Sequence, residues 1–363
     1  MFKEQTHLTL NNTINLGSFY TPQHLINIVF DMLNKNIENI KNCYLIDTSC
    51  GYGNFLMPNK LFSNDKIIGA DIDDNALKIA QNNNPNAKFY HHNSLINIDR
   101  TNYKLTDKDK IIVIGNPPYN DKTSIIRNGI KQIDFEIHND LKARDLGISF
   151  MLSYQKLKAD YVCVLHPLSY LLKKTNFDNL RSFKCNYMLK DALVISSCEF
   201  SKTSKTTQFP IVIALYEKND WGMDYNFITN WNFKTIEGKQ FRISDFDFIG
   251  NYITKYPNKH AVTLENTVAY FWTMRDINAL KRNKTFTNKA SVYTIYITKK
   301  DLNYYQYVDI FKGYIKHIPY YLGNNDVFIN NDYFIKNQEI FVNKDKDKLD
   351  TYFRDLLGEH YVD

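Results

Sequence analysis

Residues 110–119 read KIIVIGNPPY, and this stretch gives the clearest indication of the fold. Its first half, Ile111–Ile114, is a continuous run of β-branched apolar residues, as expected of a parallel strand that is buried on both faces. Its second half, Asn116–Tyr119, begins where that strand is predicted to end. Because ligands of open α/β sheets bind at the carboxyl ends of the strands, we expect this tetrapeptide to lie at a functional site.

Further strand-length apolar runs precede and follow this stretch. The first of them begin roughly 20 residues apart with helix-like segments between several of them, a spacing that suits βα units feeding a parallel sheet. The predicted strands are Cys43–Asp47, Lys66–Asp71, Ala87–His91, Lys110–Gly115, Tyr161–His166, Ala192–Ser196 and Phe209–Tyr216. The pattern therefore predicts an α/β fold with a parallel sheet.

A helix is predicted ahead of the first strand. Thr21 can cap this helix, and Pro22 suits its first position. Apolar residues then recur with a 3.6-residue period, so one face of the helix is expected to be buried. These residues are Leu25, Ile28, Val29, Met32 and Leu33.

The pattern changes after Tyr216, where Tyr, Asn and Lys become frequent and the alternation of strands and helices stops. A chain of 363 residues is long enough for two domains, and we expect them to span residues 1–219 and 220–363. In the second domain an amphipathic helix is predicted near Thr263–Lys281. The residues it is expected to bury are Leu264, Val268, Phe271 and Ile277.

The composition is that of an ordinary globular protein, with 44% apolar and 23% charged residues. No apolar run approaches the roughly 20 residues that span a bilayer, and the first residues lack the basic and apolar pattern of an export signal. The five cysteines are scattered, which argues against a disulfide framework and against a zinc site. We therefore expect a cytoplasmic protein without a metal and without a membrane partner.

Positive charge is concentrated near the C-terminus. Residues 251–320 contain 11 Lys and Arg residues but 4 Asp and Glu residues, whereas the net charge of the whole chain is +6. A localised basic region is typical of a surface that binds a polyanion. The alternative is a solvated surface that happens to be basic.

The tetrapeptide suits chemistry on an aromatic amine. Such an amino group is a poor nucleophile, because its lone pair is shared with the ring. Two acceptors aimed at its two N–H bonds would localise the lone pair, and the Asn116 amide oxygen and the Pro117 carbonyl oxygen can supply them. Pro117 and Pro118 stiffen the loop, and Tyr119 offers a ring for a flat substrate. The alternative is a proline-rich turn that ends a strand.

A second group of residues predicts a pocket for a small molecule. Asp47 ends a predicted strand and is followed by Gly51-Tyr52-Gly53 and then a helix, while Asp71 ends the next strand. Glycines let the backbone approach a ligand, and a carboxylate can bind an ammonium group or ribose hydroxyls. The third glycine of a dinucleotide fingerprint is missing, because position 56 is Leu. The pocket therefore suits a nucleoside with a cationic, amino-acid-like tail.

Taken in order, these motifs resemble the S-adenosylmethionine-dependent methyltransferases that make N6-methyladenine in DNA, and specifically their gamma subgroup. Residues 17–22 (GSFYTP) resemble the family motif before the first strand, and residues 165–170 (LHPLSY) with Phe177 and Arg181 resemble its later motifs. The resemblance covers about residues 17–217. It implies a Rossmann-like class I methyltransferase sheet in a catalytic domain, followed by a C-terminal α+β target-recognition domain.

The resemblance also implies roles for individual residues. The cofactor S-adenosylmethionine is expected to contact Tyr20, Thr21, Pro22, Asp47, Ser49, Gly51, Gly53, Asp71, Ile72, Asn93, Ser94 and Asn116. Many relatives have Asp before Phe or Leu after the third strand, whereas this chain has Asn93-Ser94-Leu95. The expected catalytic residues are Asn116, Pro117, Pro118, Tyr119 and Phe200, the last as the aromatic that sandwiches an extruded base. Phe209 is the second choice for that role, and core packing is the alternative for both phenylalanines.

The implied substrate is a specific sequence in double-stranded DNA, and the C-terminal domain is expected to bind it. The candidate DNA-binding residues are Arg275, Arg282, Lys284, Lys299 and Lys300. The implied role is that of the modification enzyme of a restriction-modification system. The chain shows no nuclease pattern, so any cognate endonuclease would be a separate protein, and we expect a monomer.

Two other kinds of function stay open at this point. Relatives with the same tetrapeptide methylate adenine in RNA or the amide of a protein glutamine, since both present a planar amino group. The chain could also be a DNA-binding specificity subunit without catalysis. The intact motifs at Asn116–Tyr119 and Gly51–Gly53 argue against the last interpretation.

Overall fold

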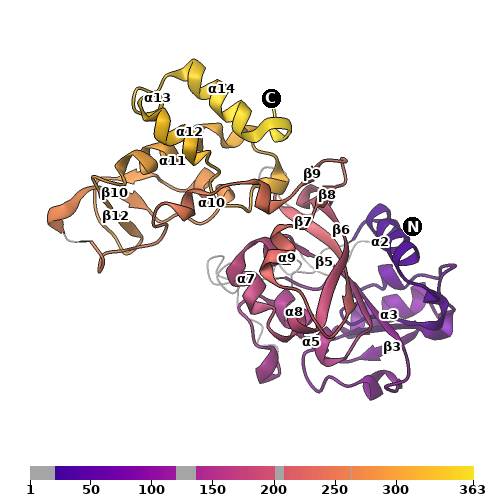
Figure 1. The fold of residues 1–363 in the computed structure, drawn as a ribbon. Coiled ribbons are helices and arrows are strands. Elements are labelled where there is room, and N and C mark those ends of the chain that lie inside the picture. Colours follow the sequence, from indigo (N-terminus) through magenta and orange to yellow (C-terminus); the bar gives the residue numbers. More distant parts are fainter. Residues whose placement is uncertain (1–20, 120–135, 201–207, 263) are drawn as a thin grey trace. The chain divides into compact units, whose positions relative to one another are not determined.

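The computed structural model describes residues 21–119, 136–200, 208–262 and 264–363. The chain forms two compact units (Figure 1). The first contains the described residues before 201 together with Ile211–Ile228, and the second contains Thr229–Asp363 with residues 208–210. The main change from one unit to the other thus lies after Ile228, a few residues beyond the expected boundary between residues 219 and 220.

The first unit is built on a sheet with the strand order β3-β2-β1-β4-β5-β7-β6. Strands β1 to β5 pair in parallel with their neighbours, and β7 runs antiparallel to β5. The strands are β1 (Tyr44–Asp47), β2 (Ile67–Asp71), β3 (Lys88–His91), β4 (Ile111–Gly115), β5 (Tyr161–Pro167), β6 (Tyr187–Ser196) and β7 (Pro210–Lys218). Every strand predicted from the sequence is confirmed, as is the expected α/β class, but the antiparallel β7 makes the sheet mixed where a parallel sheet was expected.

The centre of this sheet is fully buried. Ile111–Ile114 of β4 have no solvent exposure, which explains the unbroken run of β-branched residues. Strand β4 lies between β1 and β5, with Ile112 opposite Leu45 on one side and Tyr161 on the other. Because β1, β2 and β4 are parallel, the segments that follow Asp47, Asp71 and Gly115 leave the sheet at the same edge.

Helix α2 (Gln23–Asn36) packs its apolar face on this unit. Its N-cap residue is Pro22 and not the expected Thr21, and the cap makes no side-chain hydrogen bond. Ile26 is buried where Ile28 was expected, because Ile28 lies at the edge of the apolar stripe. The further α-helices are α3 (Asp74–Asn83), α5 (Leu146–Lys156), α6 (Ser169–Leu172), α7 (Lys174–Asn179), α8 (Ser182–Asn186) and α9 (Tyr225–Thr229).

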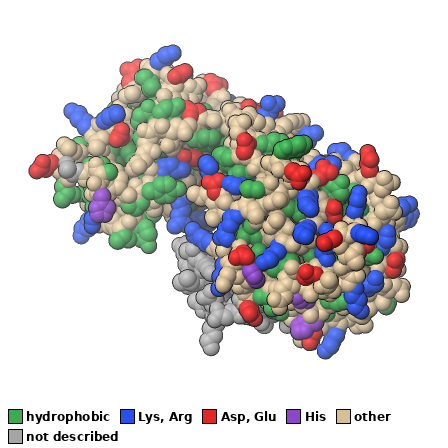
Figure 2. Space-filling view, turned by 60° about the horizontal axis from the view of Figure 1, so that its bottom comes forward, with side chains coloured by type: hydrophobic (Ala, Val, Ile, Leu, Met, Phe, Trp, Pro, Cys, Tyr) green, Lys and Arg blue, Asp and Glu red, His purple; other side chains and the backbone are tan. Residues whose placement is uncertain are grey.

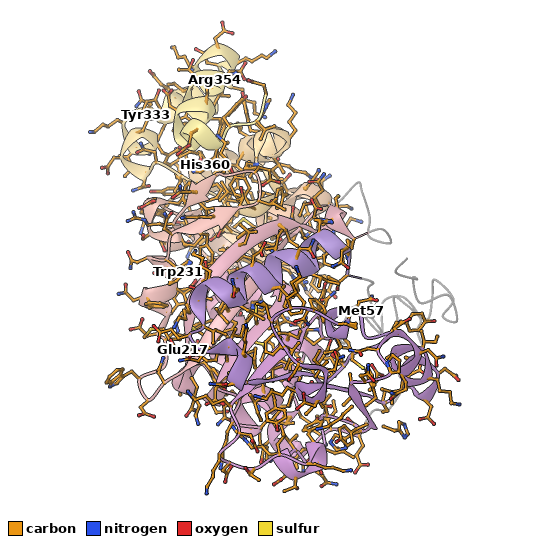
Figure 3. All side chains as sticks on the ribbon, turned by 90° about the vertical axis from the view of Figure 1, so that its right-hand side faces the viewer. Met57, Glu217, Trp231, Tyr333, Arg354 and His360 are labelled. Carbon is orange, nitrogen blue, oxygen red and sulfur yellow. The ribbon has the colours of Figure 1, made fainter. Side chains whose placement is uncertain are left out.

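The helix expected after Gly53 is only the three-residue 3₁₀ turn η2 (Asn54–Leu56). Met57, labelled in Figure 3, ends the turn in an extended conformation (ψ 150°). The reason is Pro58, which disfavours helical geometry at the residue before it and cannot donate a hydrogen bond to extend the turn.

The second unit is α+β, as expected. A small sheet has the order β11-β10-β12, formed by β10 (Thr267–Trp272), β11 (Phe286–Thr287) and β12 (Thr294–Thr298), and β8 (Phe233–Thr235) pairs with β9 (Gln240–Phe241). The helices are α10 (Ile277–Arg282), α11 (Leu302–Tyr314), α12 (Asn331–Lys336), α13 (Gln338–Val342) and α14 (Lys346–Leu357). Buried aromatic residues form its core, among them Tyr305, Tyr307, Phe311, Phe334 and Phe353.

The prediction of an amphipathic helix near Thr263–Lys281 is wrong. Residue 263 lies outside the described residues, and the segment that follows forms strand β10, a turn and the short helix α10. Leu264 and Val268 are 71% and 52% exposed, while Phe271 and Ile277 are buried as expected. The β-branched and aromatic residues of 267–272 favour a strand once β11 and β12 are available as partners. None of the helices in the described ranges has the length and hydrophobicity that a bilayer-spanning segment needs.

Candidate active site

Asp47 and Gly115 lie against one another at the carboxyl edge of the sheet. Asp47 ends β1 and is 2% exposed, and Gly115 ends the neighbouring strand β4. A Cβ atom on Gly115 would lie 2.8 Å from Asp47 Oδ1, and its φ of 144° is one that side chains rarely adopt. Only glycine therefore lets this carboxyl group sit beside the backbone immediately before Asn116.

The environment of Asp47 disfavours its ionised form. The pKa of Asp47 is raised to about 8, because burial and, to a smaller extent, the nearby charge of Asp71 raise it more than the Ser49 N–H lowers it. That N–H donates to Asp47 Oδ1 at 3.0 Å. A buried carboxyl group of this kind would be ionised by a cationic ligand, such as the ammonium group of an amino acid.

Asp71 joins the end of β2 to the loop that follows β1. Its Oδ2 accepts a hydrogen bond from the Gly51 N–H at 2.8 Å, and its Oδ1 accepts one from the Asp73 N–H at 2.9 Å. Gly51 and Gly53 have φ values of 51° and 74°, the left-handed region that glycine enters without strain. Burial raises the pKa of Asp71, while these two backbone hydrogen bonds lower it.

The loop after β3 is hydrogen-bonded to the loop after β1. The buried Ser94 hydroxyl donates to the Thr48 carbonyl at 2.8 Å. Asn93 is held at both ends of its amide, because Nδ2 donates to the Glu136 carbonyl at 2.9 Å and Oδ1 accepts from the Leu95 N–H at 3.0 Å. An amide oxygen has two lone pairs, so Oδ1 can still accept a second hydrogen bond. Ile72 is 47% exposed, as an apolar contact for a ligand would be.

Asn116 has a defined orientation. Its Nδ2 donates to the buried Thr21 Oγ1 at 3.2 Å, and its Oδ1 is the other end of the amide. A second hydrogen bond, from the Asn116 side chain, lowers the pKa of Tyr119, although burial and the charge of Asp145 raise it to a value well above the ordinary one. Pro117 is buried and Pro118 is partly buried. The expected cofactor residue Tyr20 lies outside the described residues.

A buried polar network lies beside Tyr119. Asp145 caps α5 by accepting the Gly147 N–H at 2.9 Å, and it also accepts a hydrogen bond from the Tyr170 hydroxyl. A Cβ on Gly147 would lie 3.1 Å from the Tyr119 Cβ and would collide with the Tyr170 hydroxyl. The Tyr170 ring stacks on His166, with centroids 5.2 Å apart. None of these residues was expected at the site.

His166 is neutral in this network. Burial lowers the pKa of His166 to about 4, although a backbone hydrogen bond to Pro167 raises it. Its Nδ1 donates to the Pro167 carbonyl at 3.0 Å, so its Nε2 accepts from the Tyr216 hydroxyl at 2.7 Å. The network contacts Tyr119 of the tetrapeptide, and His166 carries no charge near pH 7.

The other expected residues lie in two settings. Phe200 is buried, with 2% exposure, directly after the 3₁₀ turn that follows β6, and Phe209 is partly exposed just before β7. The candidate DNA-binding residues all belong to the second unit and are exposed: Arg275, Arg282, Lys284, Lys299 and Lys300. Within the described ranges, these five side chains make no ion pair and no group of His, Cys, Asp or Glu side chains could hold a metal ion.

The residues around the loop after β1 fit S-adenosylmethionine. The buried Ser49 Oγ has no hydrogen-bond partner in the described part of the chain, although a buried hydroxyl normally has one. The Asp47 carboxyl group and the Ser49 hydroxyl would hold the methionine end, and Asp71 with the exposed Ile72 would hold the nucleoside end.

Comparison with known proteins agrees with this geometry. Residues 6–176 match the sequence profile of the family described as N-6 DNA Methylase. The chain is 30% identical over 104 residues to the Type II methyltransferase M.CvrRI of Paramecium bursaria Chlorella virus XZ-6E. That alignment covers 28% of this chain and 24% of the relative, so the chain spans about a quarter of the length of the relative.

Solved structures that resemble the chain have lower sequence identity. The type I restriction-modification methyltransferase subunit of Streptococcus thermophilus is 16% identical, with a TM-score of 0.41, over 63% of this chain and 48% of that one. TrmN of Thermus thermophilus is 14% identical, with a TM-score of 0.34, over 54% of this chain and 48% of that one. The similarity to the N-6 DNA Methylase profile thus covers residues 6–176, slightly less than half of the chain.

Proposed function

We propose that this protein transfers a methyl group from S-adenosylmethionine to N6 of adenine in double-stranded DNA. One observation carries the proposal: the Asp47 carboxyl group lies directly against Gly115, the residue before Asn116. The carboxylate suited to the methionine ammonium and the amide suited to an aromatic amine are therefore on adjacent strands. The match of residues 6–176 to the N-6 DNA Methylase profile supports adenine N6 as the acceptor atom.

S-Adenosylmethionine, when bound, supplies an electrophilic methyl group. The protein supplies acceptors for the two N–H bonds of the adenine amino group, the Asn116 amide oxygen and the Pro117 carbonyl oxygen. Thr21 orients the amide by accepting from its nitrogen at 3.2 Å. These acceptors favour a tetrahedral nitrogen with a localised lone pair, and no strong base is needed because the alkylated nitrogen is acidic.

The target adenine must leave the duplex to reach Asn116. Extruding a base costs a few kcal/mol, and stacking on an aromatic ring returns about 1–3 kcal/mol per base. We propose Tyr119 for this stacking, with Phe200 as a second ring. Since Phe200 is buried, it would have to move or be uncovered for direct contact with the base.

The second unit is proposed to recognise a specific DNA sequence. Its exposed cations Arg275, Arg282, Lys284, Lys299 and Lys300 are suited to phosphates and guanine edges. The protein would then act as the modification enzyme of a restriction-modification system, as a monomer, with any endonuclease on a separate chain.

A methyl-transfer assay tests the proposal. Tritiated S-adenosylmethionine is offered with mixed-sequence duplex DNA, with transfer RNA and ribosomal RNA, and with a release factor, and calorimetry measures cofactor binding separately. We expect label in DNA adenine only, and no label with Asn116→Ala. Label in RNA or protein alone would redirect the proposal to those substrates. Absence of cofactor binding would favour a specificity subunit without catalysis.

A further inference from the structure

The structure separates the aromatic residues of the basic region into two groups. Tyr305 and Tyr307 of α11 are buried, with 2% and 0% exposure, and belong to the core. The second group lies on or next to the small sheet β11-β10-β12 and reaches the surface. It consists of Tyr270, Trp272, Tyr293 and Tyr296, which we call the outer aromatic face.

The pairing of the strands explains why these rings face away from the core. Phe271 is fully buried, 5.2 Å from the Tyr305 ring of α11, so the neighbouring positions 270 and 272 point to the opposite side of the sheet. Tyr296 is directly opposite Tyr270 in the ladder, and their rings meet edge to face at 5.2 Å. The two residues therefore form one continuous aromatic surface.

A second ring pair extends this surface. The rings of Trp272 and Tyr293 lie 5.2 Å apart, and Tyr293 is 50% exposed. A contiguous patch of exposed apolar and aromatic side chains, unlike a single one, marks a candidate binding surface. Planar rings at the surface of a sheet can stack on the bases of a nucleic acid.

The charge around this sheet is strongly positive. Residues 264–300 contain seven Lys and Arg residues but only two acidic residues, Glu265 and Asp276. Asp276 is occupied as the N-cap of α10, where it accepts from the Ala279 N–H at 2.7 Å. The seven cations are all exposed: Arg275, Lys281, Arg282, Lys284, Lys289, Lys299 and Lys300. In Figure 2 the second unit carries hydrophobic and Lys or Arg side chains side by side.

We propose that the outer aromatic face binds DNA where its bases are unpaired, by stacking on the exposed faces of those bases, while the surrounding cations bind the phosphates. This inference rests on the proposed function, and it assigns to Tyr270, Trp272, Tyr293 and Tyr296 a role that the cations alone cannot fill. Charge complementarity selects a polyanion as the occupant, and the aromatic rings select a polyanion with flat bases.

The test measures the affinity for single-stranded DNA by fluorescence anisotropy over a range of salt concentrations, using labelled single strands, with duplexes for comparison, and the full-length protein. Trp272→Leu and Tyr293→Leu should each weaken binding roughly 5- to 100-fold and leave the dependence of affinity on salt unchanged. A Lys299→Gln/Lys300→Gln variant should instead make the slope of log affinity against log salt concentration shallower, by the equivalent of up to about two phosphate contacts. Trp221→Leu, at a position 88% exposed in the first unit, is the matched control and should bind as the wild type does.

Several outcomes decide the inference. Tyr293→Leu changes an exposed side chain next to a strand, so it keeps the test valid if Trp272→Leu fails to fold. Unchanged DNA affinity in Tyr293→Leu would overturn the inference while wild-type methyl transfer still supports the proposed function. A change of oligomeric state in sedimentation, with unchanged DNA affinity, would assign the face to a second copy of the chain and also overturn it. Wild-type protein that binds no DNA would overturn both proposals.

Discussion

Asn116 Nδ2 donates a hydrogen bond to Thr21 Oγ1 at 3.2 Å, although 95 positions separate the two residues in the chain. The contact joins the start of α2 to the loop after β4. It holds the amide with its nitrogen toward Thr21 and its oxygen on the other side. The orientation of the Asn116 amide oxygen, the proposed acceptor, therefore depends on Thr21, a residue from another part of the sequence.

Replacing Thr21 tests this relationship. Thr21→Val keeps the volume but removes the acceptor, so we expect kcat to fall about tenfold, for about 1.4 kcal/mol of lost orientation, with little change in cofactor affinity. Thr21→Ser keeps the hydroxyl and should restore most of the activity. Steady-state kinetics with duplex DNA and calorimetry with the cofactor separate the two effects. Equal kcat for Thr21→Val and the wild type would show that the contact does not orient the amide.

Asn116→Ala removes the proposed acceptor itself. Turnover should be nearly abolished, because no other side chain replaces the amide oxygen, while S-adenosylmethionine should bind nearly as tightly as to the wild type. Single-turnover methylation and calorimetry are the two measurements. If the variant kept wild-type turnover, another group would have to accept the amino hydrogens.

Gly115→Ala should disturb the site without touching its chemistry. The added Cβ would meet Asp47 Oδ1 at 2.8 Å, and the φ of 144° is unfavourable for alanine. We expect a loss of about 1–3 kcal/mol in the free energy of unfolding and a weaker affinity for the cofactor. Urea denaturation and calorimetry measure these quantities. Gly238→Ala, at a glycine with φ 88° and open space around its Cβ, controls for backbone strain alone.

Asp71→Ala should weaken cofactor affinity by about 1–3 kcal/mol through the loss of charged hydrogen bonds. The variant also loses the hydrogen bond from the Gly51 N–H, so the loop after β1 should become less protected from amide hydrogen exchange. Asp71→Asn keeps an oxygen acceptor and should retain part of the cofactor affinity and part of the protection from exchange. An unchanged cofactor affinity in Asp71→Ala would exclude this residue from the binding site.

Asp47 should make the stability of the ligand-free protein depend on pH. Its pKa is about 8 in the folded state and 3.8 ordinarily, so the folded protein holds a proton that the unfolded chain has released between these values. The contribution of Asp47 to the free energy of unfolding is fully present below pH 3.8 and is lost as pH rises through about 8. The slope between them is at most about 1.4 kcal/mol per pH unit.

Asp47→Asn should remove this contribution, and the comparison with the wild type isolates it from other titrating groups. We expect the difference in unfolding free energy between variant and wild type to shift in favour of the variant from pH 5 to pH 9. Urea denaturation across that range measures it. A constant difference would mean that the carboxyl group is ionised in the folded protein throughout, contrary to its burial.

The strands of the first unit could be predicted because their information is local. A run such as Ile111–Ile114 indicates a buried strand wherever it occurs, and a polar residue at its end marks the edge of the sheet. The chemistry suited to Asn116–Tyr119 also follows from residue types alone. By contrast, the spacing of apolar residues in 263–281 predicted a helix, and that prediction failed. Strand β10 is stabilised by pairing with β11 and β12 further along the chain, which a local pattern does not show.

The amino-acid order alone was enough to predict the α/β class, the succession of the strands along the chain and the position of the tetrapeptide after β4, but not the antiparallel pairing of β7. Folding in three dimensions decided which groups meet: Thr21 with Asn116, Gly51 with Asp71, and Gly115 with Asp47. It also separated the buried tyrosines of α11 from the exposed rings of the small sheet. The physical reason is that backbone preferences act over a few neighbouring residues, whereas side-chain contacts and pKa values depend on elements that become neighbours only after the sheet has formed.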